Sequence, residues 1–526
     1  MIRIRQTRRN FLRTAGGLAI VGLFDPARTV SEAWSSTSAG TAGPSRIAVF
    51  FEEGFPGIDH FHLDRAVLGE ALRGIGTPDI IGVDFLTSAQ LGTGIDRSSY
   101  RLFVNPYGSA FPLEAWGAIR QFLSTGGNLL NLGGAPFSVA VNRRPDGTWE
   151  HGYPRTTYHR ELGITQSFRV AASRIPDGPV SRYVDLSGDP DGKGLADLIR
   201  VDEACELYVR FTSTRDYPGE DGTAGQRDAQ IRAEVGGFDA AGDLIVAPVV
   251  RIDRLLGEFS GGRWILANFT GSLTPAAVGN LAGRALGPVV HPSVEPTFAT
   301  YLQGETPAFA LRTPDPSRGF SGRMAGAWSV MLSDAAGKTI FRTTFRDDPP
   351  GGRYVLPRET ARKLAPGLHT VGCTFTPADG KQSGSERITA ENGFWIMDGK
   401  LLSSGRGLTA GERYFSHGDI PYPVVGTSYM SEGVQRKFLF EPNPVLWDRD
   451  FREMKRSGIN LIRTGIWTGW KNIMLDAGRL DETVLRALDA FVLTAARYDI
   501  PVVFTFFSFL PESWGGENPY LDPRAV

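Results

Sequence analysis

The hydrophobic pattern changes twice along this chain, and each change limits the folds that the residues can form. Near the start, short apolar strands alternate with single amphipathic helices, which is typical of a parallel sheet with helices on both faces. The middle shows short alternating strands between turns, which favours a β-sandwich. After Gly411 the strand–helix alternation returns. A chain of 526 residues has room for three or four domains at about 100–200 residues each.

Charge and cysteine content exclude several classes of partner. The 56 basic and 57 acidic residues leave a net charge of −1, so nothing electrostatic favours nucleic acid or an anionic membrane surface. No segment after the N-terminus is long and apolar enough for stable membrane insertion. Cys205 and Cys373 lie in different expected domains and lack a CxxC partner, so they predict no zinc site. One disulfide bridge between them remains open in an oxidising compartment.

Carboxylates and histidines gather in one stretch that follows the first expected strand. A metal site is one interpretation, because these side chains are common ligands. Their spacing matches no compact zinc motif, and the alternative is that Asp59 caps a helix while the histidines are solvated. The chain also lacks a Walker A or GxGxxG loop, so we predict no metal and no cofactor. The residues in question are Glu52, Glu53, Asp59, His60, His62 and Asp64.

The N-terminus has the features of an export signal. Arg8 and Arg9 precede Phe-Leu and a short apolar run over residues 15–24, which resembles the motif that the twin-arginine export machinery reads. We expect a signal peptide over 1–33, cleaved after Ala33, then a Ser/Thr/Ala/Gly-rich linker over 34–45 and a periplasmic or secreted protein. The alternative is a basic amphipathic start with no targeting role.

The first domain is expected over residues 46–290. Its predicted strands are 46–51, 79–86, 100–105 and 128–132, with helices over 62–74 and 113–125. The stretch YRLFVNPYGSAFPLEAWGAIRQFLSTGGNLLNLGGAPF resembles the class I glutamine-amidotransferase-like domain found beside barrels in several glycosidases. This resemblance implies a flavodoxin-like α/β domain, here with a β-rich continuation. Catalytic members carry a cysteine after such a strand, where this chain has Ala135, so we expect a noncatalytic domain.

The second domain is expected over residues 291–398. Short strands recur there between Gly, Pro and Asp turns, and they predict an immunoglobulin-like β-sandwich. Trp395, near its end, is interpreted as a core residue. The fold class is therefore multidomain α/β plus β.

The third domain is expected over residues 414–526. Strands are predicted over 423–429, 459–465 and 501–507, with helices over 444–458 and 480–498. The motifs VVGTSYM, WDRDFREMKRSGINLIRTG and VVFTFFSFLPESWGGENPYLDP resemble the start of the barrel in clan A glycoside hydrolases, particularly family 5. A TIM (β/α)8 barrel takes about 250 residues, so the resemblance implies a truncated barrel.

The resemblance also implies site residues. Both catalytic glutamates of this clan follow the fourth and seventh strands, so they would lie beyond Val526 and no catalytic residue is assigned. Arg463 is expected to brace the nucleophile, or else to form a surface salt bridge. Trp467, Trp470 and Trp514 stack on sugar rings or cap the barrel, and Tyr429 is a weaker candidate. The remaining carboxylates on the presumed active face are interpreted as loop acids: Glu432, Glu512, Glu517 and Asp522.

These expectations define an exported glycoside hydrolase whose partner is a β-linked carbohydrate. In the intact parent, the two glutamates would act by the retaining mechanism. The alternative is a noncatalytic carbohydrate-binding or scaffold protein with a vestigial barrel. A family 42-type β-galactosidase shares the amidotransferase-like module, but there the barrel precedes the module, whereas here it follows.

Overall fold

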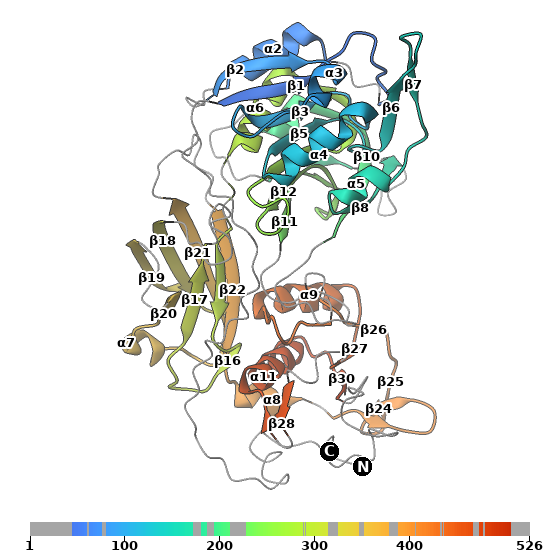
Figure 1. Cartoon of the computed structure of the whole chain (residues 1–526). Coiled ribbons are helices and arrows are strands. Elements are labelled where there is room, and N and C mark those ends of the chain that lie inside the picture. The colour runs from blue at the N-terminus through green and yellow to red at the C-terminus, as the bar shows by residue number, and fades with distance from the viewer. Residues whose placement is uncertain are drawn as a thin grey trace.

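The computed structural model forms three units that follow the chain order (Figure 1). The described residues are 45–59, 63–75, 80–171, 180–186, 194–210, 228–287, 289, 291–313, 325–346, 352–377, 388–405, 407–431, 434, 436–466, 473–476 and 479–506. The export signal predicted around Arg8 and Arg9 lies outside them. Within the described residues, no helix combines the length and apolarity needed to cross a membrane.

The N-terminal unit is built on an eight-stranded mixed sheet. Five strands are parallel, in the order β2-β1-β3-β5-β13, and three antiparallel strands, β12-β11-β9, extend the sheet. The parallel part has one of the strand orders of doubly wound sheets. The strands are β1 (Ser45–Phe50), β2 (Ile80–Leu86), β3 (Tyr100–Asn105), β5 (Asn128–Leu132), β9 (Arg182–Asp185), β11 (Ala229–Phe238), β12 (Leu244–Arg254) and β13 (Arg263–Ala267).

Helices cover both faces of this sheet because its strands are apolar on both sides. In β1, Ile47 and Val49 pack into one core and Ala48 and Phe50 into the other. The first core includes α2 (Arg65–Arg73) and α6 (Pro275–Leu286); the second includes α3 (Ser88–Gly92) and α4 (Trp116–Ser124). The remaining elements of the unit are β4 (Ala110–Pro112), η1 (Leu113–Ala115), β6 (Val139–Arg143), β7 (Trp149–His151), α5 (Thr157–Glu161), β8 (Ile164–Ala171), η3 (Leu195–Leu198), β10 (Ile199–Val209) and β14 (Phe269–Leu273).

One local prediction for this unit is wrong. The N-cap of α2 is Asp64, whose carboxylate accepts a hydrogen bond from Ala66 N at 2.6 Å. Asp59, the predicted cap, is instead only 1% exposed and accepts a hydrogen bond from the backbone of Ser109. Both aspartates precede the helix in the sequence. The contact to Ser109, which is distant in the sequence, binds Asp59 and leaves Asp64 as the helix cap.

A buried ion-pair network joins the antiparallel strands to the rest of the unit. Glu234 on β11 is 1% exposed and lies 3.2 Å from Arg251 Nε and 2.6 Å from Arg284 Nη1. Arg284, on α6, also contacts Asp185 on β9 at 2.8 Å. The network therefore connects a helix and three strands of the sheet.

A third carboxylate, that of Asp253, extends this network. Asp253 accepts two hydrogen bonds from the Arg263 guanidinium, at 2.7 and 3.1 Å, and lies 3.5 Å from Arg251 Nε. Arg251 and Arg263 are almost fully buried. Because buried charges are stable only when paired and hydrogen-bonded, the positions of these strands depend on the complete set.

The second unit is a β-sandwich. Its two sheets, in the orders β15-β17-β20 and β16-β22-β21-β18-β19, enclose a core that contains Phe309, Trp328, Phe375 and Phe394. Along β18 the buried residues alternate with half-buried ones, as expected for a strand with one covered face. The elements are β15 (Ser293–Pro296), β16 (Thr300–Tyr301), β17 (Ala308–Arg312), β18 (Gly326–Ser333), β19 (Thr339–Arg346), β20 (Arg353–Val355), α7 (Arg358–Ala361), β21 (Gly367–Pro377) and β22 (Ile388–Ile396).

Both cysteines are free and buried, so the disulfide alternative is not realised. Cys205 lies on β10 in the first unit and Cys373 on β21 in the second. Burial raises the pKa of the Cys373 thiol to about 12. The reactive thiolate of Cys373 is therefore scarce at neutral pH while the sandwich is folded. Because both thiols are buried, each can report the unfolding of its own unit.

The third unit places helices between a small parallel sheet and the sandwich. The predicted helices and strands of this region are confirmed to within a few residues. The elements are α8 (Gly399–Ser404), β23 (Thr409–Ala410), β24 (Phe415–His417), β25 (Ile420–Tyr422), β26 (Gly426–Ser428), α9 (Pro444–Arg456), β27 (Leu461–Gly465), β28 (Met474–Asp476), β29 (Arg479–Leu480), α11 (Glu482–Arg497) and β30 (Val502–Thr505).

The sandwich and the third unit share a core. Trp395, predicted to be a core residue, is 2% exposed and packs with α9 and α11, and its Nε1 donates to Thr494 Oγ1 at 3.0 Å. Gly393 is required for this approach, because a Cβ atom there would lie 2.6 Å from Val445 Cγ2. Figure 1 shows the two units side by side along β22.

A charged contact closes the edge of the same interface. The Arg486 guanidinium on α11 donates to both Glu305 oxygens, at 2.5 and 3.0 Å, and lies 4.1 Å from the Phe298 ring centroid. Arg486 is only 13% exposed. A bidentate pair of this kind fixes the orientation of the helix as well as its distance.

Candidate functional site

In the described part of the chain, the third unit presents one largely exposed face of a parallel sheet. The strand order is β26-β27-β30, and the connections run through α9 and α11. Ile462, Val502 and Phe504 pack in the core with those helices. The alternate residues of the same strands point to the opposite face, where Arg463 and Val503 are exposed and Leu461, at the amino end of β27, is buried.

Arg463 lies on this largely exposed face. It is exposed and pairs in register with Ser428 on one side and Val503 on the other. Two residues further along β27, Gly465 allows the close approach of β30, because a Cβ atom there would lie 2.8 Å from Thr505 Cβ. Arg463 therefore presents its side chain from the middle of β27, two residues before the carboxyl end of the strand, and barrel active sites gather at that end.

Tyr429, which the sequence suggests as a weaker candidate for sugar contact, is buried in the core of the third unit. Its side chain is 6% exposed, and its ring packs against Phe438, Phe451 and Phe491. Its hydroxyl donates to Asp450 Oδ2 at 2.6 Å. The residue connects the end of β26 to α9 and α11, so we do not include it in the proposed site.

Two further groups lie outside the described residues. They are the predicted contact residues Trp467, Trp470 and Trp514, and the presumed loop acids Glu432, Glu512, Glu517 and Asp522. The described residues that end the three strands and follow them are not carboxylates. They are Ser428, Tyr429, Gly465, Ile466, Thr505 and Phe506. A retaining glycosidase needs two carboxylates about 5–5.5 Å apart, and these described positions supply neither.

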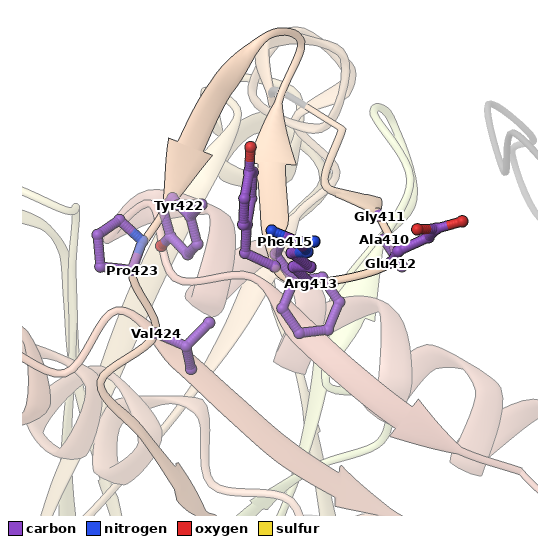
Figure 2. A pocket seen from close by; sticks show the side chains of 9 residues that line it. Ala410, Gly411, Glu412, Arg413, Phe415, Tyr422, Pro423 and Val424 are labelled. Carbon is purple, nitrogen blue, oxygen red and sulfur yellow. The ribbon is translucent and has the colours of Figure 1, made fainter.

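A cavity of about 420 Å³ lies at the opposite, amino end of these strands. Figure 2 shows the side chains around this cavity, which come from the hairpin of β24 and β25 and from the segment that enters β26. Asn460, just before β27, fixes this segment by accepting from Val425 N at 2.9 Å and donating to Pro423 O at 2.7 Å. The sequence pattern alone does not predict this cavity, although three aromatic residues in a turn-rich stretch, Tyr414, Phe415 and Tyr422, are a signal for it.

A second position of interest is the buried space at the carboxyl edge of the parallel sheet in the N-terminal unit, which the Asp59 carboxylate fills and which is here called the crevice. Two buried asparagines organise it: Asn105 Nδ2 donates to Asn131 Oδ1 at 2.9 Å and to Gly108 O at 3.1 Å. Asn131 Nδ2 in turn donates to Gly133 O at 3.1 Å. The turns after β3 and β5 are therefore held together by side chains of the strands themselves.

The turn after β5 is where the amidotransferase-like resemblance placed the missing nucleophile. Ala135 is buried there, and Phe137 has a φ of 53°, a left-handed conformation that is unusual for a bulky residue. His159 is fully buried with Nδ1 3.0 Å from Pro136 O, and burial lowers its pKa. Alanine offers no nucleophile for this histidine to activate.

The carboxylates weighed as metal ligands have separate partners. Glu52 Oε2 accepts from Ser88 N at 2.8 Å, Asp59 contacts Ser109, and Asp64 caps α2. Among the residues that the structure covers, no three His, Cys, Asp or Glu side chains gather as a metal site. His60 and His62 lie outside that part of the chain.

Comparisons with known proteins find structural similarity to glycoside hydrolases over part of the chain. No family model matches, and no curated protein matches. The β-glucuronidase of Parabacteroides merdae is 16% identical, with a TM-score of 0.17 over 40% of this chain and 22% of that chain. A β-glucuronidase from Ruminococcus gnavus, solved with D-glucuronic acid, is 13% identical, with a TM-score of 0.17 over 42% and 31%.

A family 42 β-galactosidase from G. stearothermophilus also matches. It is 13% identical, with a TM-score of 0.27 over 60% of this chain and 40% of that chain. The chain thus spans less than half the length of each of these proteins. All three TM-scores are far below 0.5, so the function proposed below rests on the chain's own residues.

Proposed function

We propose that this chain is an exported glycoside-hydrolase-like protein whose third unit binds a β-linked carbohydrate. The observation that carries this proposal is the β26-β27-β30 sheet, covered by α9 and α11 on one face and presenting Arg463 on the other. Strands, helices and polar strand ends in this arrangement match the beginning of a (β/α)8 barrel. The first unit would then be the flavodoxin-like, noncatalytic module and the second an immunoglobulin-like support.

In this proposal, Arg463 acts by hydrogen bonding. Its guanidinium offers up to five donors in a fixed plane, which suits sugar hydroxyls or a carboxylate. Trp467, Trp470 and Trp514 would add stacking surface for sugar rings. In a complete barrel of this clan, two glutamates after the fourth and seventh strands would perform double displacement, with one as nucleophile and the other as acid and base.

The described strand ends supply no carboxylate. This fits binding and hydrolysis alike, because the catalytic glutamates of this clan follow the fourth and seventh strands. The alternative function, noncatalytic carbohydrate binding, rests on the same observation. The two functions differ in one measurement: release of reducing sugar from a β-linked polysaccharide.

We expect the 526-residue chain to bind at least one of β-glucan, xylan, mannan or galactan in affinity electrophoresis without releasing reducing sugar. Arg463→Ala should weaken that binding by about 10–100-fold, since hydrogen bonds to a charged group contribute about 1.5–3 kcal/mol. Arg456→Ala is the matched control, because Arg456 is a 64% exposed arginine on α9. Equal binding by both variants, or no binding to any polysaccharide, would refute the site.

Export is a separate part of the proposal. We expect a chain carrying Arg8→Lys and Arg9→Lys to stay in the cytoplasmic fraction, because the export machinery reads the arginine pair as an address. The native chain should be found in the periplasm or medium, shortened by about the first 33 residues. Immunoblotting of cell fractions measures both. An unchanged distribution of the double variant would contradict the twin-arginine route.

A further inference from the structure

In doubly wound sheets, ligands bind at the carboxyl edge, where neighbouring strands connect in opposite directions. In the N-terminal unit that point lies between β1 and β3, because the chain goes from β1 to β2 on one side and then crosses to β3 on the other. Asp59, from the loop after β1, reaches across this point to the turns after β3 and β5 and is 1% exposed.

The Asp59 carboxylate is bound as an anion ligand would be. Its Oδ2 accepts from Ser109 N at 2.8 Å and also from Ser109 Oγ. Two glycines make room for it: a Cβ atom on Gly108 would lie 2.7 Å from Oδ2, and one on Gly134 would lie closer still. Both glycines have positive φ, so other residues would also be strained there.

The surroundings of the carboxylate are held by contacts that do not involve Asp59. The asparagine pair fixes the Gly108 and Gly133 carbonyls, and Gly134 N donates to Phe269 O at 2.9 Å. Tyr107 adds a further tie, since its hydroxyl donates to Glu52 O at 2.9 Å. The crevice is therefore built by the strand ends and merely filled by the aspartate.

We propose that Asp59 is an internal ligand of a small-carboxylate site, and that this site takes free formate or acetate once the side chain is shortened. The aspartate closes the crevice that a doubly wound sheet would otherwise offer to an external anion. Asp59→Ala removes the volume of one carboxylate, which matches formate. Asp59→Gly removes one methylene more, which matches acetate.

The test compares melting temperatures of the full chain in sodium formate, sodium acetate and sodium chloride at equal ionic strength. Asp59→Ala should melt below the native chain in chloride and recover by about 2 °C or more in formate, as expected for a ligand that binds only the folded state. Asp59→Gly should recover more in acetate than in formate. The native chain, whose crevice is filled, should show no such difference.

Asp64→Ala is the matched control, because it removes a nearby aspartate that caps a helix and fills no crevice. An equal gain in formate for Asp64→Ala would show a general salt effect and would overturn the proposal, as would the absence of any gain for Asp59→Ala. If Asp59→Ala does not fold in chloride, refolding from urea decides. A higher soluble yield in formate than in chloride supports the site, and equal yields reject it.

Discussion

Replacing Glu234 with alanine is expected to lower the free energy of unfolding of the N-terminal unit by about 3–5 kcal/mol. The carboxylate is 1% exposed and is shared by Arg251 and Arg284. Its loss removes the 3.2 Å contact of the almost fully buried Arg251, and the contact from Arg251 Nε to Asp253 is longer, at 3.5 Å. The weaker compensation of buried charge is the reason for so large an effect, whatever the net contribution of the intact network.

Urea titration with pulsed alkylation of Cys205 measures this change, because that thiol becomes accessible when the N-terminal unit unfolds. The matched control is Glu295→Ala, which breaks the pair with Arg312, at 3.6 Å and with both side chains 53% exposed. Exposed ion pairs contribute about 0–1 kcal/mol to the free energy of unfolding. Glu295 also lies in the second unit, the sandwich, so its loss should leave the N-terminal unit unchanged. A loss below 1 kcal/mol for Glu234→Ala would mean that the network contributes little to the unit.

Trp395→Ala is the second large effect, at about 3–5 kcal/mol. The indole is 2% exposed and fills the core shared by the sandwich and the third unit. Because the cavity would open between the units, we expect α11 to lose protection from hydrogen exchange first. Hydrogen exchange followed by mass spectrometry over residues 482–497 measures this.

Trp395→Phe is the matched control for that prediction. It keeps most of the buried ring but loses the hydrogen bond from the indole to Thr494, at 3.0 Å. The expected cost is therefore nearer 1 kcal/mol. Equal exchange in α11 for the alanine variant and the native chain would show that the two units do not stabilise one another.

The sequence predicts the elements well where their signals are local. Helix α9 begins after Asn443, which accepts from Leu446 N, has Pro444 at its first position, and is followed by Gly458 at a φ of 79°. These are cap and stop signals that can be read from neighbouring residues alone.

Contacts between distant residues are a different matter. Asp59 and Ser109 are brought together by the crossing from β1 to β3, and no local rule distinguishes Asp59 from Asp64 as a cap. The position of Tyr429 after a strand predicts a site residue. In the structure its ring packs instead against aromatic rings of α9 and α11 in the core. Such outcomes depend on how helices pack, which periodicity does not encode.

The shared core around Trp395 has a consequence for synthesis. Domains form in order as the chain leaves the ribosome, so the sandwich is complete before α9 and α11 emerge. Those helices then pack against β22 of a sandwich that is already folded. The strands of the parallel sheet can form on helices that are already held in place. The sandwich thus serves as a template for the unit after it, which shortens the time that the open edges of a parallel sheet are available to neighbouring chains.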